Sequence, residues 1–136
     1  MLRNIIAILA GILLGMLTIA SIEYLGQDLF PNPVSLVLDE EMYTNDLAYE
    51  MIPLPSMLMV LLAYILGSFI AGFFSAFIGQ RKSLALISGF ILFLGGLINV
   101  LIIPHPLWFI IFSLALFIPF AFFGGFVAEK FLIKKK

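Results

Sequence analysis

Four polar side chains lie inside or at the ends of long apolar stretches, and they are the residues of this chain best suited to chemistry. Glu23 ends the first stretch, Tyr64 lies within the second, Asn99 lies about one turn before the end of the third, and His105 lies in the connection that follows. A polar group at membrane depth is costly unless it faces a cavity or a polar partner. We therefore expect Glu23, Tyr64, Asn99 and His105 to form one candidate polar site.

The chemistry open to this site is limited. His105 beside Glu23 would favour a protonated imidazole, which could exchange protons, whereas the positive end of a helix would oppose that charge. Alternatively, His105 only caps a helix that starts at Pro106. Thr18 and Ser68 would extend the site toward the membrane centre. A single histidine in a chain without cysteine is a poor ligand set, so we expect no metal, no cofactor and no catalytic residue.

Composition defines the solvent in which these residues act. The 136 residues are 63% hydrophobic and 11% charged, whereas soluble domains approach about a quarter charged. Most of the surface must therefore face lipid. The length allows one compact domain, residues 1–136, and the absence of cysteine excludes disulfides and thiolate chemistry.

Four apolar stretches predict an all-α integral membrane four-helix bundle. They cover residues 4–25, 56–79, 84–103 and 107–129. The first would be about 33 Å long at about 1.5 Å per residue, enough to cross a bilayer. None shows the alternation of barrel strands. A cleaved signal peptide is the alternative for the first stretch, but its length favours a retained helix.

Charge predicts the orientation. The bases fall at the ends assigned to one side of the membrane, and seven of the eight acids fall on the other, between Glu23 and Glu50. Retained cations set topology more strongly than carboxylates do. We expect an up-down-up-down bundle in a bacterial cytoplasmic (inner) membrane, with both termini cytoplasmic. The bases are Arg3, Arg81, Lys82, Lys130, Lys134, Lys135 and Lys136.

The connection at 26–55 is the one large polar element and is predicted to be extracytoplasmic. Asp39 suits the start of a short helix that would run to Met51, with Tyr43 and Tyr49 at headgroup depth. Its acids could bind Ca²⁺, but a solvated acidic face explains them without a ligand because no EF-hand spacing occurs.

Small residues recur at a spacing of four and predict the helix interfaces, because close backbone approach drives packing in lipid. These ridges either hold this chain together or contact a second copy or a partner subunit. The predicted packing residues are Gly11, Gly15, Ala63, Gly67, Ala71, Ser75, Gly79 and Gly125.

The last apolar stretch carries further signals. Pro119 cannot bond to the carbonyl of Ala115 and predicts a kink. Trp108 is expected to anchor the chain at the membrane interface. Glu129 adjoins Lys130, and the two are expected to pair. Gly95 precedes Asn99 by four residues, so the face bearing Asn99 has room for another helix to approach closely.

The hairpin Asn-x4-Pro-His-Pro-x-Trp, here Asn99 to Trp108, resembles one that recurs in small bacterial four-helix membrane proteins. That resemblance covers the whole chain and implies the four-helix layout without an activity. The plan is also similar to that of claudin-like proteins, although their Trp-Gly-Leu-Trp sequence and cysteine pair are absent. Small multidrug transporters are similar in size, but they carry a carboxylate deep in the first helix, whereas Glu23 lies near an end.

Three hypotheses for function follow. The first is a non-enzymatic accessory or scaffolding subunit of a membrane complex, with lipid, a membrane protein or a second copy as partner and no nucleic acid. The second is a small-solute or lipid transporter with a polar site in the outer leaflet, which a pocket reaching past Tyr64 toward the bilayer centre would favour. The third is an intramembrane enzyme, which would require Glu23 and His105 within hydrogen-bonding reach.

Overall fold

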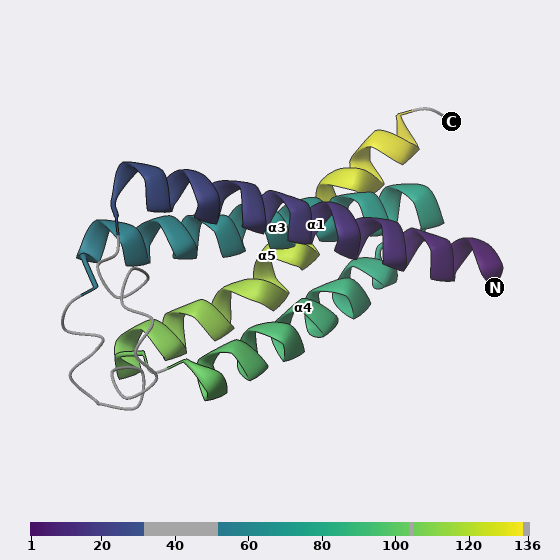
Figure 1. Cartoon of the computed structure of the whole chain (residues 1–136). Helices are drawn as coiled ribbons and strands as arrows, with labels where there is room; N and C mark the ends of the chain where they lie inside the picture. The colour runs from purple at the N-terminus through teal and green to yellow at the C-terminus, as the bar shows by residue number, and fades with distance from the viewer. Residues whose placement is uncertain (32–51, 104, 135–136) are drawn as a thin grey trace.

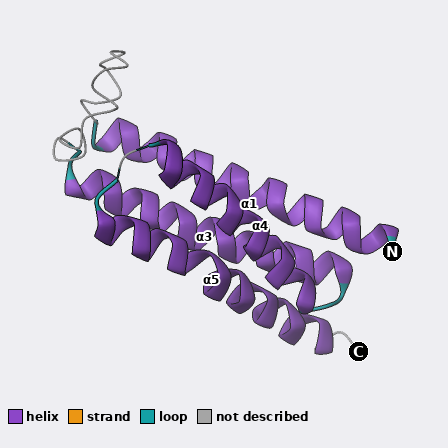
Figure 2. Cartoon of the chain, turned by 90° about the horizontal axis from the view of Figure 1, so that it is seen from below, coloured by secondary structure: helices purple, strands orange, loops and turns teal. Residues whose placement is uncertain are grey.

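The computed structural model describes residues 1–31, 52–103 and 105–134, and these residues form four helices without a strand. The helices are α1 (Leu2–Leu29), α3 (Leu54–Gly79), α4 (Ser83–Ile102) and α5 (Leu107–Ile133). They lie side by side along one another, with the N and C termini toward the same end (Figures 1 and 2). Each is long and apolar enough to cross a membrane, which confirms the predicted class.

Prolines mark three of the helix boundaries. Pro53 and Pro106 are the N-cap residues of α3 and α5, and Pro31 follows the end of α1 by two residues. Proline is tolerated at a helix start because the first amides need no partner, and it disfavours helix in the residue before it. α1 continues to Leu29 and α5 to Ile133, each four residues past the apolar span predicted for it. The helix expected from Asp39 to Met51 lies outside the described residues.

The turn between α3 and α4 depends on an unusual backbone conformation. Gln80 has a φ of 58°, the left-handed conformation that usually requires glycine at the end of a helix. The amide of Arg81 donates to the carbonyl of Ala76 at 3.2 Å, which satisfies one of the last carbonyls of α3. The chain then enters α4 within three residues.

The interior is built from small residues, and the large apolar side chains point outward. Seven alanines are at most 1% exposed, and Ser68, Ser75, Ser88 and Ser113 are also buried, while most of the leucines and isoleucines are exposed. In water this distribution would be costly, because apolar area is stabilised by removal from solvent. It suits a bundle whose outer surface meets lipid.

α1 and α3 approach closely at their glycines. A methyl group added at Gly11 would meet Ser75 and the carbonyl of Ala71, and one added at Gly15 would meet Ala71 and the carbonyl of Gly67. Such positions allow backbones to approach within the range that strengthens dispersion contacts. Near one end Gly79 lies against Ala7, and near the other Gly26 lies against Met59.

α5 packs against α3 and α4 through a second set of small residues. An added methyl at Gly72 would meet the backbone of Ala121, and one at Gly124 would meet the carbonyl of Phe69. Gly125 lies against Ala85 on α4. α5 thus packs closely against both α3 and α4, while α1 packs chiefly on α3.

Two expectations for α5 have different outcomes. Glu129 pairs with Lys82 across the helix interface, with Nζ and Oε2 3.1 Å apart, so the expected pairing with Lys130 is wrong. Lys130 instead places its Nζ 4.6 Å from the ring centroid of Phe126. Adjacent residues on a helix diverge by about 100°, which separates the side chains of Glu129 and Lys130. Pro119 lies inside α5, and the predicted kink stays a prediction.

Candidate functional site

A cavity of about 470 Å³ runs between α1 and α4, and we call it the outer cavity. α3 and α5 provide its floor through the buried rings of Tyr64 and Phe117. On its open side Met16 is 56% and Ile91 41% exposed, so the cavity opens where α1 and α4 face the surroundings. The lining residues are Ile12, Met16, Ile19, Ala20, Glu23, Tyr64, Ile91, Leu92, Gly95, Gly96, Asn99 and Phe117.

The polar groups gather toward one end of this cavity. Asn99 donates a hydrogen bond from Nδ2 to Oη of Tyr64 at 3.2 Å, and the ring of Tyr64 packs on that of Phe117 with centroids 4.9 Å apart. Because the tyrosine oxygen accepts from Asn99, its own proton is free for another acceptor. Glu23 lines the same space. Three of the four predicted site residues therefore meet in one cavity.

The polar and apolar parts of the outer cavity lie at different depths. Glu23 lies about two turns before the end of α1 at Leu29, and Asn99 lies in the last turn of α4, which ends at Ile102. Met16 and Leu92 lie near the middles of the same two helices. The cavity thus extends from a polar end, toward the Leu29 and Ile102 ends of α1 and α4, to an apolar region near the middles of these helices.

Gly95 gives the cavity its width. Alone among the glycines of the chain, it has no atom within 4 Å of the point where a Cβ would lie. The room expected beside Gly95 is therefore present, and the described helices leave it open, while Asn99 on the same face bonds to Tyr64 of α3. An absent side chain at Gly95 leaves space that the cavity occupies, whereas neighbouring Gly96 lies against the ring of Phe117.

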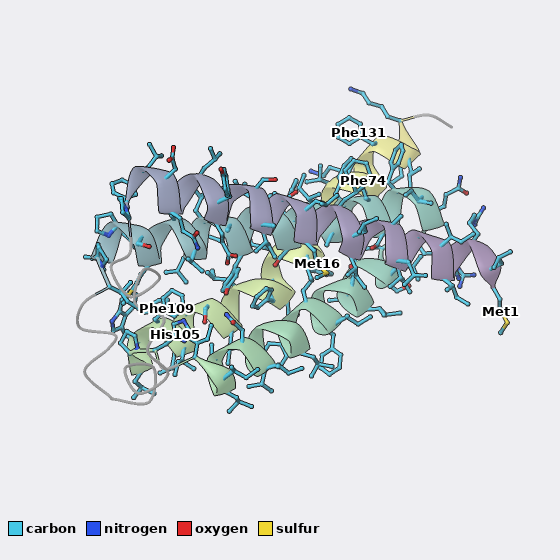
Figure 3. The ribbon with its side chains drawn as sticks, in the orientation of Figure 1. Met1, Met16, Phe74, His105, Phe109 and Phe131 are labelled. Carbon is cyan, nitrogen blue, oxygen red and sulfur yellow. The ribbon has the colours of Figure 1, made fainter. Side chains whose placement is uncertain are left out.

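His105 lies apart from the outer cavity. α5 starts at Leu107 with Pro106 as N-cap, so His105 precedes the cap and the prediction that it occupies the cap is wrong. Its Nδ1 lies 2.7 Å from the carbonyl oxygen of Ile103, and its ring stacks on Phe109 with centroids 4.9 Å apart. Figure 3 shows His105 and Phe109 together at the end of the bundle opposite Met1.

The environment of His105 changes its protonation. Burial lowers the pKa of the imidazole below its ordinary value, and the hydrogen bond with Ile103 acts in the opposite direction. His105 is not among the residues that line the outer cavity. The structure therefore does not assemble the Glu23 and His105 pair that an intramembrane enzyme would need.

The other predicted extensions of the site do not reach the cavity. Thr18 donates to the carbonyl of Leu14 in its own helix at 2.8 Å. Ser68 is buried, and its hydroxyl has no partner among the described residues. Trp108 is 38% exposed and meets Phe109 edge-on, near the end of the bundle where an interfacial anchor is expected.

Sequence reasoning missed the apolar walls of the site. Met16, Ile91 and Phe117 lie in uniformly apolar stretches, where nothing separates a cavity wall from a lipid-facing side chain. The usable signal was the pair Gly95 and Gly96 one turn before Asn99, which removes two side chains beside a polar group.

Within the described ranges no group of three His, Asp or Glu side chains is placed to hold a metal ion. Comparisons with protein-family models, curated proteins and solved structures find no match for this chain.

Proposed function

We propose that this protein is a multi-pass membrane protein that binds an amphiphilic molecule, a lipid or a lipophilic solute, in the outer cavity and handles it as a carrier or transporter. One observation carries the proposal: the cavity of about 470 Å³ is polar at one end, apolar toward the bundle centre and open between α1 and α4. Sites for small molecules commonly enclose about 300–1,000 Å³ and combine apolar walls with few polar groups.

The polar groups favour a head that donates hydrogen bonds. The carboxyl of Glu23 offers acceptor oxygens, and Tyr64 with Asn99 offers a fixed hydroxyl and amide beside it. A protonated amine or a hydroxyl would find an acceptor there, whereas an anionic head would face a carboxyl. The hydrocarbon chain of the bound amphiphile would lie along Met16, Ile91 and Phe117.

The proposed orientation is an up-down-up-down bundle in a bacterial cytoplasmic membrane with both termini inside. Contacts support it, because Arg3 donates to the carbonyl of Gly79 and Lys82 pairs with Glu129, so bases from α1, the α3–α4 turn and α5 share one end. The positive-inside rule assigns that end to the cytoplasm. The polar end of the outer cavity then lies in the outer leaflet.

An accessory role in a membrane complex, or self-association, is the second proposal. The exposed apolar faces of all four helices would accept either lipid or protein. The small-residue ridges that suggested a partner pack within this chain, since Gly11, Gly15 and Gly67 lie between α1 and α3. This proposal therefore needs a surface other than those ridges.

Photolabelling tests the first proposal. The probe is dodecylamine with a diazirine on its chain, added to the purified protein in micelles and mapped by digestion and mass spectrometry. We expect labelled peptides from α1 and α4. The variant Gly95→Leu should lose most of this labelling, because its side chain would fill open space in the outer cavity.

Leu94→Phe is the matched control, since it enlarges a lipid-exposed neighbour that does not line the cavity. In Glu23→Gln, about tenfold more unlabelled dodecylamine should be needed to displace the probe, because hydrogen bonds to charged groups contribute roughly 1.5–3 kcal/mol. The concentration of dodecanol needed to displace the probe should not change. Equal labelling of Gly95→Leu and the unaltered protein would contradict the cavity assignment. If dodecylamine displaced the probe equally well from Glu23→Gln and from the unaltered protein, only the assignment of the ligand's polar head to Glu23 would be contradicted.

A further inference from the structure

A second cavity of about 470 Å³ lies at the opposite end of the bundle, between the α3–α4 turn and the last turns of α5. We call it the basic-end cavity. Its walls combine charged and polar groups with apolar ones. The lining residues are Ala76, Gln80, Arg81, Lys82, Glu129, Leu132 and Ile133.

The charges of this cavity are not balanced. Lys82 pairs with Glu129 at 3.1 Å, and its Nζ also lies 5.5 and 5.8 Å from the ring centroids of Phe122 and Phe126. Those contacts neutralise and hold the lysine. Arg81 is exposed, and no hydrogen bond or ion pair of its side chain occurs among the described residues. The guanidinium of Arg81 therefore offers five hydrogen-bond donors in a planar arrangement that matches a phosphate.

The surroundings add to this positive potential. Arg3 donates to the carbonyl of Gly79 at 3.3 Å and so covers the negative end of α3 next to the cavity. α4 begins at Ser83, directly after the lining residues Arg81 and Lys82, so its positive helix end lies beside the cavity. Within the described ranges, Glu129 is the only acid of the cavity, and Lys82 already neutralises it.

The apolar wall identifies the kind of anion. Leu132 and Ile133 lie beside the charged groups, and Ala76 closes the inner side. A free ion would leave this wall uncovered, whereas the glycerol and upper chain carbons of a lipid would cover it. We propose that the basic-end cavity binds the headgroup of an anionic phospholipid, with the phosphate on the guanidinium of Arg81 and the glycerol region against Leu132 and Ile133.

Native mass spectrometry of the protein with phosphatidylglycerol or phosphatidylcholine of equal chain length tests this site. Arg81→Gln should weaken phosphatidylglycerol binding at least about tenfold, because it removes the charge-assisted hydrogen bonds between the guanidinium and the phosphate. Phosphatidylcholine should bind more weakly and lose less, because its choline cation offsets the charge of its phosphate. The matched control Lys134→Gln removes an equal charge from the end of α5 without touching the cavity, and should change binding less than about twofold.

A second variant tests the apolar wall without removing charge. Leu132→Trp should fill the cavity and weaken phosphatidylglycerol binding as Arg81→Gln does, while both variants keep their helix content by circular dichroism. Equal losses in Arg81→Gln and Lys134→Gln would overturn the proposal, because only the general charge of this end would then matter. Displacement of the lipid by millimolar inorganic phosphate would also overturn it, since the site would then take a free anion.

Discussion

Asn99 and Tyr64 form a side-chain pair that ties two helices together at the polar end of the outer cavity. Their hydrogen bond is 3.2 Å long and joins α4 to α3, with the tyrosine ring buried on Phe117. Interhelical bonds of this kind in membranes average about 0.6 kcal/mol when measured by double-mutant cycles. The pair is therefore a positioning element whose contribution to stability is modest.

A double-mutant cycle on Tyr64→Phe and Asn99→Leu measures this pair. Each single variant removes one partner, so we expect the losses to be non-additive, with a coupling of roughly 0.5–1 kcal/mol. The measurement is the free energy of unfolding in mixed micelles on titration with a denaturing detergent. Additive losses within about 0.3 kcal/mol would show that the two side chains do not interact.

The protonation of His105 predicts a pH dependence of stability. Burial lowers the pKa of the folded imidazole below its ordinary value, so the unfolded chain binds this proton first as the pH falls. The stability contributed by the neutral imidazole is present above about pH 6.5, the ordinary value, and is lost as the pH falls toward the lower folded pKa. The advantage over His105→Gln should therefore shrink between about pH 7.5 and 5.5.

The measurement is the thermal midpoint of both proteins across that range. The carboxyl groups affect both curves alike, so the difference between them isolates His105. A difference that grows on acidification would mean that the folded state favours the imidazolium.

Sequence reasoning predicted the depth of the site residues and missed their direction around the helix axis. Glu23, Tyr64 and Asn99 meet because each lies at similar depth on a face that points inward. His105 follows the end of α4, and its imidazole bonds to Ile103 and stacks on Phe109 within its own hairpin. Hydropathy does not indicate which way the imidazole of His105 turns, because its orientation depends on the backbone between two prolines.

At the scale of helices, identical glycines have opposite roles. Gly15 is buried against Ala71 and the carbonyl of Gly67, whereas Gly95 meets open space. The four-residue spacing marks small residues but does not say whether a helix or a cavity fills the room beside them. This is why the ridge along α3 could be recognised in the sequence and the outer cavity could not.

A matched pair of substitutions separates the two roles. Gly15→Leu should cost about 1–3 kcal/mol of stability or prevent folding, because the new side chain would force α1 away from α3. Gly95→Leu should leave stability unchanged or raise it by up to about 1 kcal/mol, because glycine is a poor helix former. Unfolding free energies in the same micelles compare them. A large loss in Gly95→Leu would show that its surroundings are packed.

For the whole molecule, the four helices could be predicted from length and hydropathy alone, because each apolar stretch has only the helix as a solution in lipid. The pairing of Glu129 with Lys82 instead of Lys130 could not be predicted in this way, because it depends on how α4 packs against α5. The chain lacks cysteine, so single cysteines report on topology without background.

Cysteine labelling in intact cells tests the orientation. Asp28→Cys, near the end of α1, should react with a membrane-impermeant maleimide added outside. Ser83→Cys, at the start of α4 beside Arg81 and Lys82, should react only after the membrane is permeabilised. The reverse pattern would place the bases outside, and the polar end of the outer cavity would then not lie in the outer leaflet.

The most direct test of the central claim follows the methyl group of Met16, which lines the apolar part of the outer cavity. In protein carrying ¹³C-methyl methionine, assigned with Met16→Leu, we expect nuclear Overhauser effects between the chain of added dodecylamine and Met16, and none to Met1 at the far end of the bundle (Figure 3). Saturable effects at Met16 that disappear in Gly95→Leu are the predicted result. Weak, non-saturating effects at every exposed methionine alike would contradict it, because the amine would then only dissolve in the micelle.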